Sequence, residues 1–469
     1  MATVSARILV GLLHGWRDAG AAYSALAERI RLLVLDGRVA AGTRLPAERE
    51  LASQLDVSRT TITAAYAALR EAGYLESVRG SGSVTRLPHR SAVASDPLET
   101  ELADFSKATM PALPAVVAAS RRAAEQLPAY LGESGFDPLG LSVLREAIAA
   151  RYGVRGLPTT ADQIMVTIGA QHAIALIART VMARGDRAVI ENPTYPHAMD
   201  ALKTAGARLV PVSVTTDAGW DELALTQVIQ RTSPSLAYLM PDNHNPTGRS
   251  MPTSLREHVV ALAEHHGTTI VADETMAELG FGAQQLPFAV HGPAVLVGSV
   301  GKTVWGGLRL GWIRADRTMI QRLARARSSG DLGTPILEQL VVAELLKNFD
   351  EIVETRRGTL RAGRDHLASL LAASIPEWHV PDVHGGLTAW VGLGRPVSSQ
   401  LALAARNEGL MIAAGPRFGV DGAFERFIRI PFSYPPSQTE RAVEALVRAW
   451  QTVRRHDALD PIGELASIA

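Results

Sequence analysis

Residues 42–83 read GTRLPAERELASQLDVSRTTITAAYAALREAGYLESVRGSGS and decide the fold of the N-terminal part of this 469-residue chain. Pro46 suits the first turn of a helix, which we expect to run to Leu55. Ser58 suits the N-cap of a second helix, which Gly73 is placed to end. The apolar positions of that helix recur at helical spacing. They are Ile62, Ala65, Tyr66 and Leu69.

Two short segments follow, Tyr74–Val78 and Ser83–Arg86, and the glycine-containing turn between them predicts a hairpin. Upstream, Ala22–Leu35 carries apolar residues at helical spacing and predicts a further helix. Helix, helix, turn, helix and hairpin are the layout of an α+β winged helix-turn-helix domain, which we place at residues 1–87. This segment has 11 Arg, no Lys and 8 Asp or Glu, whereas the whole chain has 47 basic and 47 acidic residues. A mildly basic module is compatible with a polyanionic partner.

Residues 42–83 resemble the DNA-binding domain of the GntR family of bacterial transcription regulators over nearly their whole length. The resemblance implies that the partner is double-stranded operator DNA. A recognition helix contacts base edges with its first residues, and hydroxyl groups at a helix N-terminus suit phosphate oxygens. We expect DNA contacts from Arg49, Ser58, Arg59, Thr60, Thr61, Arg79 and Gly80. The alternative is a winged helix that binds protein instead of DNA.

Residues 88–104 contain two prolines and no sustained periodicity, so we interpret them as a linker. Beyond them, short apolar runs alternate with helical stretches. The predicted strands are Gln163–Thr167, Ala188–Glu191, Leu236–Met240, Thr268–Ala272 and Val295–Val297. This alternation predicts an α/β domain at residues 105–469, with a largely parallel sheet and helices on both faces. Ligands of such sheets bind at the carboxyl ends of the strands.

The sequence SVGKTVWGGLRLGW at residues 299–312 directly follows the last of these strands. Lys302, just beyond the strand end, can form a Schiff base with an aldehyde cofactor. Ser299 and Arg309 flank it and can hold a phosphate group. Asp273 ends an earlier strand, and a carboxylate there can keep a pyridine nitrogen protonated, which makes the ring an electron sink.

A third motif lies at the junction between the first of these strands and a helix predicted at His172–Val181. Backbone N–H groups and the helix dipole bind anions at such a junction. The residues of this turn are Gly169, Ala170 and Gln171. The simpler interpretation of each motif alone is a turn, a cap or a surface charge. Their order along the chain favours a site.

Together, the motifs in residues 105–450 resemble those of fold-type I aminotransferases, which bind pyridoxal 5'-phosphate. By this resemblance, Asn245 of NPTG binds the ring hydroxyl and Tyr195 of NPTYP stacks on the ring. Arg429 of FIRIP falls at the arginine that binds the substrate α-carboxylate, although the nearby Arg426 leaves the register open. The whole chain resembles the MocR/GabR-type subfamily of GntR regulators, in which a winged helix is fused to an aminotransferase-like domain. That resemblance also implies a homodimer.

Two departures from the aminotransferase pattern bear on activity. A tyrosine usually follows the aspartate by two or three residues and donates to the ring oxygen, but Thr275 and Met276 stand there. A thioether cannot donate, and a threonine hydroxyl is short. The family often has a tyrosine in a Y-G-D-P segment that reaches the partner's phosphate, where this chain has Gly135-Phe136-Asp137-Pro138. We expect at most residual transaminase activity.

The preferred hypothesis is therefore a cytoplasmic transcription regulator that senses pyridoxal phosphate, or an amino compound reacting with it, through a Lys302 Schiff base. One alternative is an active aminotransferase with an accessory DNA-binding domain. Another is a regulator whose body has lost its cofactor and serves only in dimerisation. The chain has no cysteine, which excludes disulfides and thiolate metal sites, and we predict no metal site. We expect no membrane segment, and Ile8–Leu13 is too short for a signal peptide.

Overall fold

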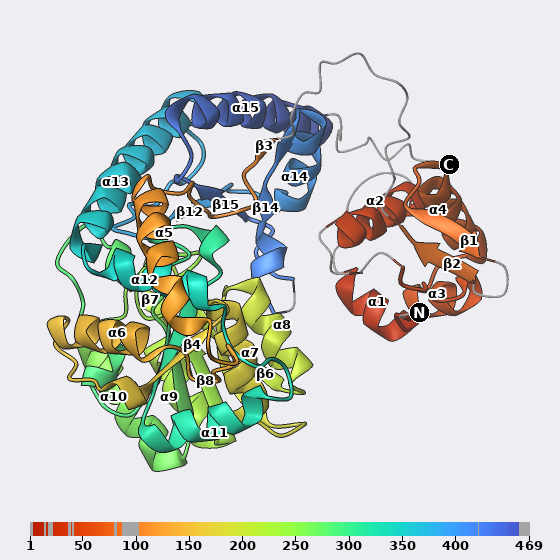
Figure 1. Cartoon of the computed structure of the whole chain (residues 1–469). Coiled ribbons are helices and arrows are strands. Elements are labelled where there is room, and N and C mark those ends of the chain that lie inside the picture. Colours follow the sequence, from red (N-terminus) through yellow and green to blue (C-terminus); the bar gives the residue numbers. More distant parts are fainter. Residues whose placement is uncertain are drawn as a thin grey trace, which may run out of the picture.

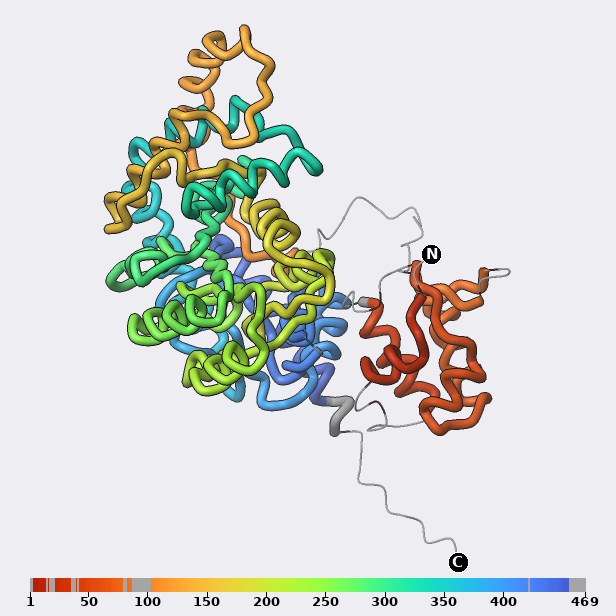
Figure 2. The backbone as a smooth tube through the Cα atoms, turned by 90° about the horizontal axis from the view of Figure 1, so that it is seen from below, coloured from red at the N-terminus to blue at the C-terminus, as the bar shows by residue number. Residues whose placement is uncertain are grey.

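The computed structural model describes residues 3–13, 16, 22–35, 39, 42–78, 82–86, 103–420 and 422–458. An N-terminal helical domain with a small hairpin stands beside a large α/β body (Figures 1 and 2). The predicted multidomain fold class is confirmed. Among the described residues, no helix has both the length and the apolar character needed to cross a membrane.

The N-terminal domain is a winged helix-turn-helix. Its elements are α1 (Ala6–Leu12), α2 (Ala22–Leu35), α3 (Glu48–Leu55), α4 (Arg59–Glu71), β1 (Leu75–Val78) and β2 (Gly82–Thr85). The hydroxyl of Ser58 accepts a hydrogen bond from the Thr61 amide at 3.2 Å, which confirms the predicted N-cap. Gly73 has a φ of 76°, a left-handed conformation that ends the helix, as predicted.

Two features of this domain differ from the sequence prediction. Pro46 is not the first residue of α3: the helix begins at Glu48, and the Pro46 carbonyl instead accepts a hydrogen bond from the Tyr66 hydroxyl at 3.0 Å. The helix α1 was not predicted, because its seven residues are too few to show a helical spacing of apolar positions. Leu9 and Leu13 are fully buried in the domain core, which makes α1 part of the fold.

The body is built on one eight-stranded sheet in the order β4-β11-β10-β9-β8-β5-β6-β7. The predicted strands correspond to β4 (Ile164–Thr167), β5 (Arg187–Asn192), β8 (Leu236–Leu239), β9 (Thr269–Asp273) and β10 (Val295–Ser299). The five strands from β10 to β6 are parallel, which confirms the predicted character of the sheet. Three strands were not predicted: β6 (Arg208–Thr215), β7 (Gly219–Trp220) and β11 (Gly311–Arg314). Strand β11 runs antiparallel between β4 and β10.

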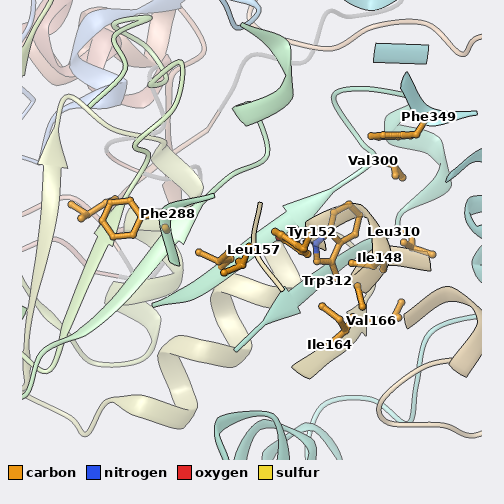
Figure 3. Close-up of a cluster of buried hydrophobic side chains, with 14 of the residues drawn as sticks. Ile148, Tyr152, Leu157, Ile164, Val166, Phe288, Val300, Leu310, Trp312 and Phe349 are labelled. Carbon is orange, nitrogen blue, oxygen red and sulfur yellow. Dashed lines mark hydrogen bonds between the residues drawn. The ribbon is translucent and has the colours of Figure 1, made fainter. Parts of the chain in front are cut away.

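Helices cover both faces of this sheet, because alternate residues of each strand enter two separate cores (Figure 1). One face carries α7 (Ala170–Val181), α8 (Pro196–Thr204) and α11 (Arg317–Arg327). The other carries α5 (Ala115–Gln126), α6 (Ser142–Val154), α9 (Glu222–Thr232), α10 (Thr253–His266) and α12 (Ile336–Leu346). Figure 3 shows this second core, where Tyr152 lies beside Trp312 and accepts its indole N–H at 3.1 Å.

A second, smaller unit completes the body and was not predicted as a separate sheet. Its three strands are ordered β12 (Thr388–Gly392), β15 (Phe427–Pro431) and β14 (Ala413–Ala414). Its helices are α13 (Phe349–Ser374), α14 (Ser398–Asn407) and α15 (Pro436–Ala458). Strand β13 (Leu410–Met411) pairs with β3 (Ala103–Asp104). Of the predicted linker, residues 88–102 lie outside the described residues, and its last two residues form β3.

Candidate functional site

One cavity of about 420 Å³ lies where the strands of the large sheet end. It opens at the carboxyl ends of β8, β9 and β10 and reaches the small unit through η6 (Gly415–Phe418) and β15. All ten site residues predicted in the body line it. They are Gly169, Ala170, Gln171, Tyr195, Asn245, Asp273, Ser299, Lys302, Arg309 and Arg429. Residues up to 260 positions apart in the chain therefore share one chamber.

Lys302 stands in the loop after β10, and its ammonium donates a hydrogen bond to the Ala108 carbonyl at 2.6 Å. Burial, and to a smaller extent the nearby Arg429 guanidinium, lowers the pKa of Lys302 to about 8, and the Asp273 carboxylate opposes both effects. An ordinary lysine is almost entirely protonated near neutral pH. A pKa near 8 makes a substantial fraction of neutral, nucleophilic amine available.

Asp273 is buried at the end of β9 and is held by two donors. Its Oδ2 accepts the Tyr238 hydroxyl at 2.7 Å, and its Oδ1 accepts the Thr275 amide at 3.0 Å. Burial raises the pKa of Asp273 above its ordinary value, and hydrogen bonding by Thr275 and Tyr238 offsets only part of that rise. Sequence reasoning missed Tyr238, because a tyrosine within an apolar strand carries no sign that its hydroxyl serves an acid on the next strand.

The turn between β4 and α7 is shaped for an anion. Gly169 has a φ of 100°, and a Cβ there would come within 3.2 Å of Arg309 Nη2, so this cradle needs glycine. Helix α7 begins at Ala170, two residues before the predicted start. Arg309 donates to the Ile168 carbonyl at 3.3 Å, and the Ser299 hydroxyl donates to the Leu310 carbonyl at 2.9 Å. A guanidinium and a helix N-terminus are donors that suit a phosphate, and the Ser299 hydroxyl would join them by turning its one proton away from Leu310.

The two arginines of the FERFIRIP segment lie in different surroundings. Arg429 lines the cavity, donates to Asn245 Oδ1 at 3.3 Å and to the Ser106 carbonyl at 2.5 Å, and lies 4.9 Å from the Phe418 ring centre. Arg426 instead donates to the Gly394 carbonyl outside the cavity. Burial lowers the pKa of Arg429 to about 10. Its Nε is buried and has no hydrogen-bond partner among the described residues, so a charged donor remains for a ligand.

The two departures from the aminotransferase pattern have different positions. Thr275 and Met276 line the cavity. Thr275 contributes its amide to Asp273, and Met276 offers its carbonyl to Asn243 Nδ2 at 2.8 Å. Phe136, in contrast, is 68% exposed on the surface of the chain and does not line the cavity.

Of the predicted DNA contacts, five lie among the described residues of the winged helix. Ser58, Arg59 and Thr60 are exposed, as is Arg49 on α3, whereas Thr61 is half-buried. The Ser58 hydroxyl is engaged with the hydroxyls of Thr60 and Thr61 at 2.7 and 2.8 Å. The Arg59 side chain is 71% exposed. Arg79 and Gly80 lie outside the described residues.

Residues 104–446 match the family described as aminotransferase class I and II. The chain belongs to this family. Residues 22–84 match the bacterial regulatory proteins of the gntR family, so the two parts are a GntR DNA-binding domain and an aminotransferase domain. This is the organisation expected of MocR/GabR-type regulators.

Relatives of both kinds are similar to this chain. A 2-aminoadipate transaminase of Thermus thermophilus is 29% identical over 348 residues, which cover 71% of this chain and 86% of the enzyme. The uncharacterized HTH-type transcriptional regulators YisV of Bacillus subtilis and YdcR of Escherichia coli are each 27% identical and cover 90% of this chain, and 94% and 98% of their own length. Among solved structures, LysN, the α-aminoadipate aminotransferase of Thermus thermophilus, matches 79% of this chain and 96% of its own with a TM-score of 0.69 at 26% identity.

The fold-type I aminotransferase domain implies pyridoxal 5'-phosphate as cofactor, and the cavity fits that group. The Gly169 turn and Arg309 suit its phosphate, Asp273 suits a ring nitrogen, and Lys302 is an amine of lowered pKa. A carboxylate, a phosphate cradle and a partly neutral lysine in one chamber form the donor set of this cofactor.

Proposed function

We propose that this protein is a transcription regulator that binds operator DNA through its winged helix and senses pyridoxal phosphate, or an amino compound that reacts with it, in the body cavity. One observation carries the proposal: a half-buried lysine of pKa about 8 shares a cavity with Asp273 and Arg429, in the same chain as a GntR domain. The helix-turn-helix relatives that span nearly the whole chain support it.

Each of the ten predicted site residues in the cavity has a role in this proposal. Pyridoxal phosphate supplies an aldehyde that condenses with primary amines and a pyridine ring that withdraws electrons. Lys302 offers the amine, and Asp273 holds a proton at the ring nitrogen. Asn245 donates to the ring hydroxyl and Tyr195 covers the ring. The phosphate is bound by Gly169, Ala170, Gln171, Ser299 and Arg309, and Arg429 binds the carboxylate of an amino ligand.

The DNA contacts are proposed for Arg59 at the start of α4, which is 71% exposed, and for the hydroxyls beside it. Arg49 on α3 is exposed for a phosphate contact, and Arg79 and Gly80, which lie outside the described residues, complete the proposed set. The Ser58 hydroxyl already caps α4, so its contribution is to fix the helix N-terminus that faces a phosphate.

We also propose that the protein acts as a homodimer in the cytoplasm. Support comes from large apolar side chains that stay exposed in the single chain, among them Leu131 at 71%, Phe136 at 68% and Leu332 at 54%. A twofold dimer would present two winged helices to paired half-sites. The absence of cysteine is consistent with a reducing compartment.

The second candidate is an active aminotransferase, favoured by the transaminase relative and by the complete lysine, aspartate and arginine set. Thr275 and Met276 weigh against it, because neither places a phenol at the ring. Formation of a keto acid by the purified protein, at turnover comparable with that of ordinary transaminases, would replace the sensing proposal.

The deciding experiment selects a binding duplex from a random-sequence pool and measures its affinity with and without pyridoxal phosphate. We expect the affinity to change with cofactor in the wild type and in Lys347→Ala, whose lysine pairs with Glu344 outside the cavity. Lys302→Ala should bind the duplex but lose the response and the visible absorption of bound cofactor. A full response in Lys302→Ala would contradict the proposal, and so would failure to select any duplex.

A further inference from the structure

The cavity is rich in basic side chains. Five basic side chains line it, against the carboxylates of Asp242 and Asp273. The basic residues are Lys107, Lys302, Arg309, Arg417 and Arg429. Asp242 is already paired with Arg256 at 2.6 Å, and Lys107 is paired with Asp104 at 2.7 Å. Asp273 is therefore the one lining carboxylate left to balance a lysine and three arginines.

Arg417 is the cation without an assigned partner. Arg309 lies against the Gly169 turn, and Arg429 donates a hydrogen bond to Asn245. Arg417 is exposed at the cavity wall and has no hydrogen bond or ion pair with the residues that the structure describes. It lies close enough to Arg429 to help lower the pKa of that guanidinium. Two neighbouring guanidinium groups repel each other until an anion lies between them.

The segment that carries Arg417 is firmly held. The Thr194 amide donates to the Phe418 carbonyl at 2.9 Å, and the Val420 amide donates to Asn192 Oδ1 at 3.1 Å. A Cβ at Gly415 would meet the Phe424 carbonyl oxygen at 1.9 Å, so only glycine allows this close packing. The arginine is thus presented from a packed loop beside Tyr195 rather than from a free surface chain.

We propose that the ligand of this cavity is an amino acid with a second acidic group at its far end, and that Arg417 binds that group while Arg429 binds the α-carboxylate. The inference rests on the proposed function, because it names the class of amino compound that the same site takes. A second carboxylate or sulfonate would relieve the repulsion between the arginines with charge-assisted hydrogen bonds. A neutral or basic side chain would leave Arg417 without an anion.

The test compares L-glutamate with its neutral isostere L-glutamine on the cofactor-loaded full chain, by calorimetry and by the change in visible absorption. We expect L-glutamate to bind roughly tenfold tighter, as one charged hydrogen-bonded contact provides. Arg417→Gln should abolish this ratio, Arg417→Lys should keep part of it, and Arg426→Gln, outside the cavity, should leave it unchanged. An unchanged ratio in Arg417→Gln, or equal affinities in the wild type, overturns the inference and leaves the proposed function standing. If the wild type never acquires visible absorption, the proposed function fails first.

A different observation carries a second inference, about how the cavity is linked to the DNA-binding domain. Arg29 of α2 pairs with Glu425 of the body at 2.9 Å, and each side chain is only 18% exposed. Glu425 is fixed by three further hydrogen bonds, from the Ser398 hydroxyl and from the amide and hydroxyl of Ser399, at 2.8 to 3.1 Å. The body therefore holds this carboxylate in place for the arginine of the other domain.

Packed aromatic rings connect Glu425 to the cavity. Phe424, next to it, has a φ of 76° and its ring lies 5.9 Å from the Trp390 ring centre. Trp390 in turn lies 5.3 Å from Phe418, which lines the cavity beneath Arg429. On the other side, α2 packs in one core with the recognition helix α4. A shift of the Phe418 and Phe424 rings would thus reach Glu425 and, through Arg29, the DNA-binding domain.

The geometry points to the Arg29–Glu425 ion pair as the contact that docks the DNA-binding domain on the body. Ligand binding in the cavity changes the fraction of time for which this ion pair is formed. The docked and undocked states differ in the contacts that Phe418 and its neighbours make with the ligand. This difference gives the ligand different affinities for the two states, which coupling requires. A partly buried ion pair is weak enough to open under such a bias.

The chain has no cysteine, so Ser53→Cys and Ser374→Cys, at two exposed positions, can be labelled with a donor and an acceptor dye. Labelled chains are diluted into unlabelled protein, so that energy transfer occurs within one chain. We expect Arg29→Glu to lower the transfer and the Arg29→Glu/Glu425→Arg swap to restore it. Arg31→Glu, which breaks the pair with Glu28 and the contact with the Tyr74 ring, both within the DNA-binding domain, is the control. Unchanged transfer in Arg29→Glu overturns the docking contact. A response to pyridoxal phosphate plus L-glutamate that persists in Arg29→Glu overturns its coupling to the cavity.

Discussion

The lowered pKa of Lys302 leads to a prediction that needs no bound cofactor. Burial and the Arg429 charge bring this pKa from 10.5 to about 8. At pH 8 about half of the Lys302 side chains are then neutral, compared with about 0.3% for an unperturbed lysine, a difference of roughly 150-fold. The fraction of neutral Lys302 falls toward zero as the pH drops below 8 and approaches one well above pH 8. Nucleophilic reactivity of Lys302 should follow the same curve.

The assay is pulsed acylation of the cofactor-free protein between about pH 6 and 11, read at each lysine by peptide mass spectrometry. The chain is suited to this, because its lysines are Lys107, Lys203, Lys302 and Lys347. Lys107 is an internal contrast, since its ion pair with Asp104 raises its pKa. The midpoint of each profile is compared rather than its rate, so limited access of reagent to the cavity does not alter the result.

Two variants fix the sign of the electrostatic contributions. Asp273→Asn removes the negative charge that supports the ammonium, so the Lys302 midpoint should move below that of the wild type. Arg429→Gln removes the opposing positive charge and should move it upward, but still below 10.5, because burial is the largest cause. A wild-type midpoint above 10, or an upward shift in Asp273→Asn, would refute the account of this lysine.

Three further predictions concern the DNA-binding domain and the core of the body. Arg59→Ala should weaken binding to the selected duplex by about 1–3 kcal/mol if it reads a base, and unchanged affinity in a titration would exclude that role. Ser58→Ala removes the cap on the Thr61 amide and should lower the free energy of unfolding of the winged helix by about 1 kcal/mol in urea; no change would show that the cap is dispensable. Asp242→Ala strips the fully buried Arg256 of its carboxylate and should destabilise the body by about 3–5 kcal/mol, whereas a loss below 1 kcal/mol would mean that water replaces the carboxylate.

Local chemistry is what the sequence determined. The N-cap at Ser58, the end of α4 at Gly73 and the helix at Ala22–Leu35 follow from contacts within a few residues, and all three are present. The five predicted strands were recognisable because each is a buried apolar run that needs no partner to be identified. The order of the motifs at the strand ends was sufficient to predict one chamber, since parallel strands bring their carboxyl ends to the same edge.

The tertiary structure alone decided what depends on contacts between distant segments. The choice of Arg429 over Arg426 is a matter of strand register, and the hydrogen bond from Tyr238 to Asp273 joins neighbouring strands. Strand β11 was not predicted from the sequence. It pairs antiparallel with β4 and β10, and these two strands, between which it lies, are far apart in the chain. Arg417 near Arg429 and Arg29 on Glu425 had no local signal at all. In the sequence, a charged residue in a loop cannot be told from one that is simply solvated. Its electrostatic interactions are set by the residues that folding brings next to it.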